Sequence, residues 1–303
     1  TRRLPASGAG PSPERLMLGS EGILGVITEA WMRVQVRPRY RASASVRFTA
    51  FESGVAAARA VAQSHLYPSN CRLLDPLEAL MNGVPADGGA VLLLGFESAD
   101  HPPEARLRRA IELAEECGGA LTRPPTVRDD GLGGQGRGGD ATAEAWRQAF
   151  FDGPYRQSAL IALGVLADTF ETCCTWRDFP ALHRALEEAA RGAFERLGGR
   201  GVLSCRFTHV YPDGPAPYYT FVVGGLARVD LLEAWGEVKG AVSDALLARG
   251  ATITHHHAVG KLHRPWYDRE RPGLFAAALR GVKGVLDPAG VLNPGVLIEG
   301  GGR

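Results

Sequence analysis

The chain has 303 residues, of which 45% are hydrophobic, and it carries 34 basic and 33 acidic side chains for a formal net charge of +1. This length and apolar content suffice for a buried core in one large domain or two ordinary ones, so we expect a soluble globular protein. The balanced charge excludes a general attraction to nucleic acid or to an anionic membrane, and a charged ligand must meet local arginine or lysine side chains.

Cysteine usage points to a reducing compartment, which we take to be the cytoplasm. The five cysteines are odd in number and lack paired C-x-x-C spacing, which argues against a disulfide framework or a zinc ribbon. No apolar run approaches the ~20 residues that cross a bilayer. The chain opens on Thr1 without methionine and continues as a loop-like segment to Pro13, so we expect it to be the interior part of a longer protein.

The first structured segment combines a glycine-rich turn with an expected strand. Residues 19–30 read Gly-Ser-Glu-Gly-Ile-Leu-Gly-Val-Ile-Thr-Glu-Ala, and their glycines permit tight turns and close approach of a ligand to the backbone. The turn matches neither the dinucleotide fingerprint nor a Walker loop, so taken alone it is a structural turn by default. Alternation from Trp31 to Val36 predicts a strand that ends before Pro38.

The next part of the chain predicts strands and helices in the order of a ferredoxin-like layer. Strands are expected at Ser43–Phe48, Asn70–Asp75 and Ala90–Phe96, and helices at Ser53–His65 and Glu104–Cys117. The order strand, helix, strand, strand, helix is that of a split βαβ unit with an antiparallel sheet.

The rest of the chain predicts a second set of similar elements after a glycine-rich loop. Residues 124–140 hold six glycines and predict a flexible surface loop. After it we expect a helix near Ala143–Phe151, a strand at Leu160–Phe170, a helix at Phe179–Leu197, hairpin strands at Val202–Val210 and Tyr218–Val223, and helices at Leu231–Arg249 and Gly273–Val285. This set is consistent with a diverged duplicate of the first.

The densest chemistry lies in residues 254–261, Thr-His-His-His-Ala-Val-Gly-Lys. Imidazole titrates near neutrality, so a histidine run can donate, accept or bind metal. In an extended segment His255 and His257 share one side and His256 faces the other, so at most two can serve one site directly. A chance histidine cluster in a polar loop is the equal alternative. We expect no metal, because no companion ligand motif stands at familiar spacing.

Three motifs in order resemble the C-terminal half of the FAD-linked oxidases of the vanillyl-alcohol oxidase superfamily. They are residues 19–30, residues 255–261 and Asp287-Pro-Ala-Gly-Val-Leu-Asn-Pro294. Within this superfamily the chain resembles the alkyldihydroxyacetonephosphate synthase (alkylglycerone-phosphate synthase) family, which has three histidines where D-lactate dehydrogenases have Glu-His-Gly. The resemblance extends through residues 70–75, 154–156, 168–176 and 205–218.

The resemblance implies an α+β fold in which a ferredoxin-like-derived cap domain has a large antiparallel sheet backed by helices. C-terminal helices would pack on an FAD-binding lobe that is mostly absent from this sequence, so we expect the chain as written to bind FAD poorly. The implied boundaries are residues 1–38 for the end of the FAD-binding lobe, 39–254 for the substrate or cap domain with its flexible loop 124–140, and 255–303 for the active-site and flavin-lobe segment.

The resemblance also assigns site residues. Tyr218 matches the catalytic tyrosine, His255, His256 and His257 match the histidine run needed for activity, and Arg156 and Arg72 match arginines tied to substrate binding and activity. The residues that match FAD contacts are Ser20, Glu21, Gly22, Ile23, Leu24, Gly25, Val26 and Ile27. Without the family, Tyr218 is a hairpin tyrosine that packs on the sheet, and both arginines are ion-pair residues. Two positions depart from the family pattern: Ala258 replaces a glycine and Gln157 replaces an aspartate.

The implied activity is exchange of the acyl group of an acyl-dihydroxyacetone phosphate for a fatty alcohol, which makes an ether lipid precursor with no net use of FAD as an oxidant. Tyr218 would be the general base if a nearby cation or the cofactor lowers a phenol pKa that starts at ~10. Arg156 would hold phosphate or carboxylate by a two-pronged contact. The expected partner is a small-molecule lipid, with peripheral membrane contact and a homodimer left open.

Two alternatives remain. One is an FAD-linked 2-hydroxy-acid dehydrogenase that acts on D-lactate or glycolate, which His256 in place of glutamate and the presence of Tyr218 disfavour. The other is a non-catalytic remnant or interaction domain.

Overall fold

The computed structural model describes residues 4, 7–131, 141–226 and 230–299. The chain forms two compact units. The sheet unit is Val36–Ala251, and the terminal unit combines the two ends of the chain, Thr1–Gln35 and Thr252–Arg303. Each unit is described by itself below. No helix among the described residues is long and apolar enough to cross a membrane.

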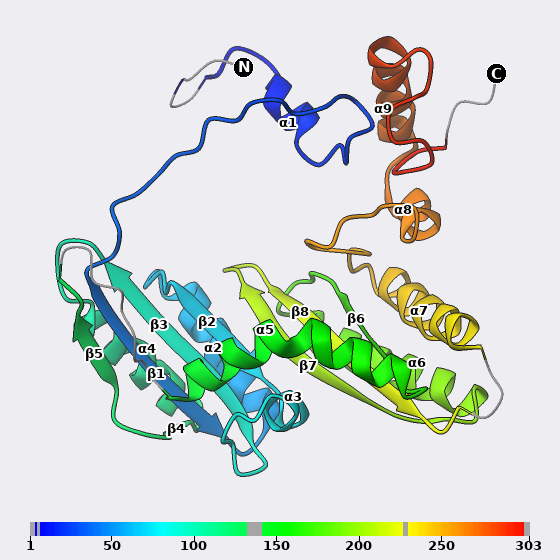
Figure 1. The fold of residues 1–303 in the computed structure, drawn as a ribbon. Coiled ribbons are helices and arrows are strands. Elements are labelled where there is room, and N and C mark those ends of the chain that lie inside the picture. Colours follow the sequence, from blue (N-terminus) through cyan, green and yellow to red (C-terminus); the bar gives the residue numbers. More distant parts are fainter. Residues whose placement is uncertain (1–3, 5–6, 132–140, 227–229, 300–303) are drawn as a thin grey trace. The chain divides into compact units, whose positions relative to one another are not determined.

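The sheet unit is built on an eight-stranded antiparallel sheet in the order β4-β1-β3-β2-β7-β8-β6, with β5 also paired to β1 (Figure 1). The strands are β1 (Tyr40–Phe48), β2 (Asn70–Leu74), β3 (Ala90–Ser98), β4 (Ala120–Leu121), β5 (Thr126–Asp129), β6 (Leu166–Glu171), β7 (Arg200–Val210) and β8 (Pro215–Gly224). The expected α+β fold with a large antiparallel sheet is confirmed.

The sheet consists of two similar halves. In the first half, β4-β1-β3-β2 with α2 (Phe51–Gln63) and α4 (Glu104–Glu116) has the strand order of a ferredoxin-like layer. In the second half, β6, α6 (Phe179–Arg196), β7, β8 and α7 (Leu231–Ala248) follow the same sequence of elements, and β6-β8-β7 repeats the order β1-β3-β2. This topology supports the interpretation of the second half as a diverged duplicate.

The two faces of the sheet differ in character because successive side chains of a strand point to opposite sides. On one face, Phe207 of β7 is fully buried, and its ring lies 5.9 Å from that of Phe51 in α2 and 4.9 Å from that of Phe179 in α6. Leu74 and Tyr218 both lie opposite Arg206 in the register, so these three positions share the other face. The helices α2 and α6 therefore cover the apolar face.

The terminal unit has a small core of its own. Its helices are α1 (Pro13–Met17), α8 (Arg264–Glu270) and α9 (Gly273–Leu286). The buried core residues come from both ends of the chain and are Ile23, Leu24, Val259, Leu279, Val296, Leu297 and Ile298.

Some expected elements are wrong. Trp31–Val36 is not a strand in the structure, because none of the described strands pairs with it and its apolar side chains are exposed. The strand expected at Leu160–Phe170 begins only at Leu166, since α5 (Ala141–Ala162) continues into the apolar run and ends near Gly164, whose φ is +75°. An apolar run by itself does not distinguish a helix from a strand.

The expected loop at residues 124–140 contains β5, and its residues 132–140 lie outside the described residues. Short helices α1, α3 (Pro76–Met81) and α8 were not predicted. For α3 the sequence held a usable signal, because Asp75-Pro76 followed by Glu78 has the residue types of a helix start.

Phe207→Ala should lower the free energy of unfolding of the sheet unit by about 3–5 kcal/mol, because it removes a fully buried ring and leaves a cavity between α2 and α6. Urea unfolding followed by circular dichroism measures the change. Leu163→Ala, at a side chain that is 79% exposed, is the control and should change stability by less than about 0.5 kcal/mol. A small effect of Phe207→Ala would contradict this account of the core.

Candidate active site

The three motifs that carry the family resemblance meet at Glu21 in the terminal unit. The Glu21 carboxylate accepts hydrogen bonds from the backbone amides of Val259 at 2.8 Å and Gly260 at 2.7 Å, just after the histidine run. The side-chain amide of Asn293, in the third motif, donates to the Glu21 carbonyl at 2.5 Å. Residues far apart in sequence therefore form one polar junction.

The backbone at this junction has an unusual conformation. Glu21 has a φ of +49°, Gly22 of +78° and Ala258 of +71°, all in the left-handed region. The Cβ atom of an L-residue disfavours this region, and glycine, which has no Cβ, adopts it at no steric cost. The glycine common in the family at position 258 is explained by this φ, and Ala258 adopts the conformation at some strain.

The histidine side chains do not alternate as expected. The Nδ1 atoms of His255 and His256 are 3.2 Å apart, and the ring centroids of His256 and His257 are 4.4 Å apart. The prediction that His256 faces away from its neighbours was wrong, because residues 255–257 form bends that lead into the turn at Ala258 and do not form a strand. Neighbouring imidazoles are thus gathered on one short turn.

A second anchor holds the glycine-rich turn from α9. The Lys283 ammonium donates to the carbonyl of Ile23 at 2.8 Å and to that of Leu292 at 2.7 Å, and it forms an ion pair with Asp287. Lys283 holds the pKa of Asp287 below its usual value. The lysine links the first and third motifs by a route independent of Glu21.

Of the eight residues expected to contact FAD, Glu21 and Gly25 are half-buried, and the other six divide into two groups. Ile23 and Leu24 are core residues and Ser20 is buried, so their side chains pack within the terminal unit. Gly22, Val26 and Ile27 are exposed, and none of the described residues forms a hydrogen bond to the backbone of Val26 or Ile27. A segment with exposed apolar side chains and available backbone groups fits a flat, partly polar group such as a flavin.

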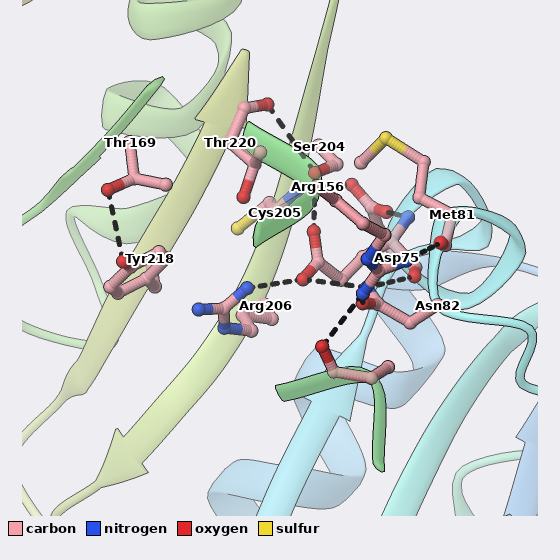
Figure 2. Close-up of polar contacts among 12 residues, drawn as sticks. Asp75, Met81, Asn82, Arg156, Thr169, Ser204, Cys205, Arg206, Tyr218 and Thr220 are labelled. Atoms are coloured by element: carbon pink, nitrogen blue, oxygen red, sulfur yellow. Dashed lines mark hydrogen bonds and ion pairs between the residues drawn. The ribbon is translucent and has the colours of Figure 1, made fainter. Parts of the chain in front are cut away.

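In the sheet unit, Tyr218 lies on the face opposite Phe207, on the side of the sheet that also bears Leu74. Its hydroxyl donates to the Thr169 hydroxyl at 3.0 Å, and the Arg206 Cζ lies 3.8 Å from the centroid of its ring (Figure 2). Tyr218 and Arg206 are direct cross-strand partners of β8 and β7. The half-buried tyrosine is therefore oriented at both its ring and its hydroxyl.

A buried carboxylate supports Arg206 from α3. Glu78 is 1% exposed and forms an ion pair with Arg206. Its carboxylate also accepts hydrogen bonds from the Ser204 hydroxyl at 2.5 Å and the Asn82 amide at 3.2 Å. The buried charge of Glu78 is thus paired and hydrogen-bonded, as a buried charge requires.

Asp75 joins α3 to β7. Its oxygens accept hydrogen bonds from the backbone amides of Glu78 at 2.6 Å and Cys205 at 2.5 Å. Burial raises the pKa of Asp75 to about 7, while these amide hydrogen bonds oppose the rise. Asp75 is therefore expected to change charge near neutral pH.

Of the two predicted substrate arginines, Arg72 lies on β2, two residues before Leu74, and therefore shares a face of the sheet with Arg206. Burial, and secondarily the charge of Arg206, lower the pKa of Arg72, which stays protonated because an arginine titrates far above neutrality. Two guanidinium groups thus bring positive charge to the face that bears Tyr218.

Arg156 lies on α5 and is exposed. It donates to the carbonyl of Met81 at 3.0 Å, to the carbonyl of Ala149 at 2.7 Å and to the Asn82 side chain at 3.3 Å (Figure 2). Contact with an anion would have to compete with these three bonds.

Sequence reasoning missed Glu78, Arg206 and Lys283. Arg206 follows Cys205 in a segment that was noted only for its resemblance, and the alternation of β7 and β8 does not reveal which residues pair. Lys283 and Asp287 stand four residues apart at the end of a predicted helix, a spacing typical of a helical ion pair.

Glu21→Ala should remove the acceptor of the Val259 and Gly260 amides. A hydrogen bond to a charged acceptor contributes about 1.5–3 kcal/mol, so hydrogen exchange of these amides should accelerate at least about tenfold. Mass spectrometry of peptides that span residues 254–262 measures this. Glu29→Ala, at an exposed position of the same segment, should leave the exchange unchanged, and equal effects of both variants would contradict the role of Glu21.

Asp75→Asn should change how stability depends on pH. An aspartate titrates near ~3.9 in the unfolded chain, so between about pH 4 and pH 7 the folded protein binds a proton that the unfolded chain has lost, and the free energy of unfolding falls as pH rises through this window. Between pH 4.5 and pH 7.5, the free energy of unfolding of the native protein should fall by about 2–4 kcal/mol more than that of Asp75→Asn. Urea unfolding at each pH measures it. Asp213→Asn, at an exposed turn, should show the same dependence of the free energy of unfolding on pH as the native protein. The same dependence in Asp75→Asn would refute the titration of Asp75 near pH 7.

Comparisons with known proteins agree with this architecture. The family model described as FAD linked oxidases, C-terminal domain, matches residues 37–297. Alkyldihydroxyacetonephosphate synthase of Caenorhabditis elegans is 25% identical over 98% of this chain and 52% of its own length. The synthase of Dictyostelium discoideum is 26% identical over 96% of this chain and 49% of its own length. Glycolate oxidase subunit GlcD of Bacillus subtilis is 22% identical over 95% of this chain and 57% of its own length.

Solved structures show the same fold. A structure of alkyldihydroxyacetonephosphate synthase has a TM-score of 0.70 at 20% identity and covers 94% of this chain and 50% of that chain. Substrate-bound p-cresol methylhydroxylase has a TM-score of 0.55 at 13% identity and covers 87% of this chain and 54% of that chain. The chain spans about half the length of the curated relatives first compared. Since the family model matches most of its residues, the chain belongs to the C-terminal domain family of the FAD linked oxidases, whose cofactor is FAD.

Proposed function

We propose that the chain is the C-terminal portion of an FAD-dependent enzyme that exchanges the acyl group of an acyl-dihydroxyacetone phosphate for a fatty alcohol. The observation that carries this proposal is the oriented Tyr218, with its hydroxyl bonded to Thr169 and its ring beside Arg206. The similarity to alkyldihydroxyacetonephosphate synthases along nearly the whole chain supports it.

Each proposed role follows from the chemistry of the side chain. Bound FAD supplies the electron-accepting ring system on which the exchange depends, and the segment at Gly22, Val26 and Ile27 holds it. Tyr218 takes the proton from the substrate carbon that bears the acyloxy group, because a phenolate oxygen is a sufficiently strong base. Thr169 orients the Tyr218 hydroxyl.

The substrate is an anion at one end and a hydrocarbon at the other. Arg72 supplies positive charge for the phosphate, and Arg156 joins it if its bonds to the carbonyls around α3 are exchanged for bonds to the ligand. His255, His256 and His257 accept and return protons as the carboxylate leaves and the alcohol enters. The product class is an ether lipid precursor, and we place the enzyme in the cytoplasm.

Tyr218→Phe in the full-length enzyme should abolish alkyl exchange, by at least about a hundredfold, because the general base is removed. The flavin absorption spectrum should stay that of the native enzyme, since the change deletes one hydroxyl. Incorporation of a labelled fatty alcohol measures the exchange. Tyr155→Phe, at a side chain that is 80% exposed, should retain native turnover.

The same enzyme distinguishes the dehydrogenase alternative, which the similarity to glycolate oxidase subunit GlcD keeps relevant. Under anaerobic conditions D-lactate should leave the flavin oxidised, and an acyl-dihydroxyacetone phosphate should change its spectrum. Bleaching by D-lactate, or near-native exchange by Tyr218→Phe, would overturn the proposed function.

A further inference from the structure

The pairing of β7 with β8 is interrupted by one extra residue. Phe207 of β7 lies opposite Pro217 of β8. The next pair of the register joins His209 to Ala216, so Thr208 has no partner on β8. This is the pattern of a β-bulge, which changes the direction of the side chains that follow it and is frequent next to active sites.

The bulge decides which face of the sheet carries His209. Side chains alternate along an unbroken strand, so His209 would otherwise share the face of Phe207. Instead, its partner Ala216 lies two residues before Tyr218 and therefore on the same face as Tyr218. Diagonal neighbours of adjacent strands lie about 7–8 Å apart, within reach of long side chains. Since His209 is exposed, the bulge presents an accessible imidazole near the proposed base.

The bulge does not favour stability. The Thr208 hydroxyl is buried and has no hydrogen-bond partner among the residues that the structure describes. A buried hydroxyl without a partner costs free energy, and the extra residue also interrupts the hydrogen-bond ladder between the strands. Unfavourable local arrangements of this kind are concentrated at functional sites. This cost supports a functional reason for the position of His209.

Arg72 lies on the other side of the bulge, on β2. The two strands are antiparallel, and Leu73 is the partner of Phe207. Arg72 is one residue earlier on β2, so it lies beside Thr208 at the bulge, one strand spacing of about 4.8 Å away. Because Arg72 also shares the face of the proposed base, a guanidinium and an imidazole flank the same short stretch of this face.

Charge is distributed unequally across this face. The strand order is β2-β7-β8-β6, and Tyr218 lies on β8. Arg72 and Arg206 lie on the β2 and β7 side, and Arg206 is paired with Glu78. On the β6 side, the buried Glu171 lies directly opposite Tyr218. The anionic group of a ligand is therefore favoured over β2 and β7 and disfavoured over β6.

We propose that His209 is a further substrate-binding residue, whose ring N–H donates a hydrogen bond to the substrate phosphate beside Arg72. A neutral imidazole keeps one ring N–H, so this contact does not depend on the protonation state of His209. The Tyr218 hydroxyl is directed to Thr169 of β6, so the carbon that loses its proton lies towards β6 and the phosphate towards β7 (Figure 2). This role rests on the proposed function, because it assumes a phosphorylated substrate.

The experiment measures the Kd of dihydroxyacetone phosphate for the full-length protein by isothermal titration calorimetry. His209→Leu removes the donor and should raise this Kd at least about tenfold, because a hydrogen bond to a charged acceptor is lost. His209→Gln keeps an N–H donor and should stay within about threefold of the native Kd. An equal loss of affinity in both variants would overturn the proposed hydrogen bond.

His101→Leu is the matched control. His101 lies after the end of β3, its side chain is 63% exposed, and its printed side-chain contacts are with Ser98 and Asp100. The variant removes the same chemical group from another surface position of the sheet unit. It should leave the Kd of dihydroxyacetone phosphate unchanged, and a loss equal to that of His209→Leu would overturn the proposal.

Kinetics of the active enzyme add a second readout. His209→Leu should raise the KM of the acyl-dihydroxyacetone phosphate by a factor similar to the rise in Kd, and it should leave kcat within about twofold of native, because His209 binds the substrate and is not the base. A fall in kcat with an unchanged KM would contradict a binding role.

The outcomes separate this role from the proposed function. Native affinity in His209→Leu overturns the role of His209 and leaves the proposed function standing. Absence of dihydroxyacetone phosphate binding by the native protein overturns both. If Tyr218→Phe retains alkyl exchange while His209→Leu loses affinity, the assignment of the base is wrong and the phosphate contact of His209 is supported.

Discussion

The short pairing of β2 with β7 is the interaction on which the sheet unit depends. Only two residue pairs, Leu73 with Phe207 and Leu74 with Arg206, join the two halves of the sheet in the described register. Asp75 extends this contact, since its own amide donates to the Cys205 carbonyl at 3.0 Å and its carboxylate accepts from the Cys205 amide. The same pairing places Arg206 directly opposite Leu74 and therefore on the same sheet face as Arg72. The strand register thus determines which side chains surround the candidate site.

Carboxylates join distant segments of this protein at two places. Glu78 connects α3 to β7, and Glu21 connects the glycine-rich turn to the histidine turn. A buried or half-buried carboxylate is tolerated only when hydrogen-bond donors replace the water it has lost. The donors must therefore lie at fixed positions around the carboxylate. The candidate residues beside them, Tyr218 and His255–His257, are therefore positioned through contacts of these carboxylates.

The two units present different side chains. The sheet unit presents a phenol and guanidinium groups on a rigid sheet face, which suits proton abstraction beside an anionic substrate. The terminal unit presents imidazoles on a tight turn, together with an exposed segment suited to a flavin.

The sequence by itself determined most strands and helices, because apolar alternation and helical spacing reflect which side of each element is buried. Its motifs also identified the family and the candidate residues Tyr218 and His255–His257.

The sequence could not reveal that Trp31–Val36 lacks a partner strand among the described residues, nor that α5 extends to Ala162, since an apolar run is compatible with several structures. Only the tertiary structure decided that Glu21 holds the histidine turn and that Glu78 holds Arg206 over Tyr218. Both contacts depend on strand register and on positive-φ turns that bring together residues more than a hundred positions apart, and no local pattern encodes such a pairing.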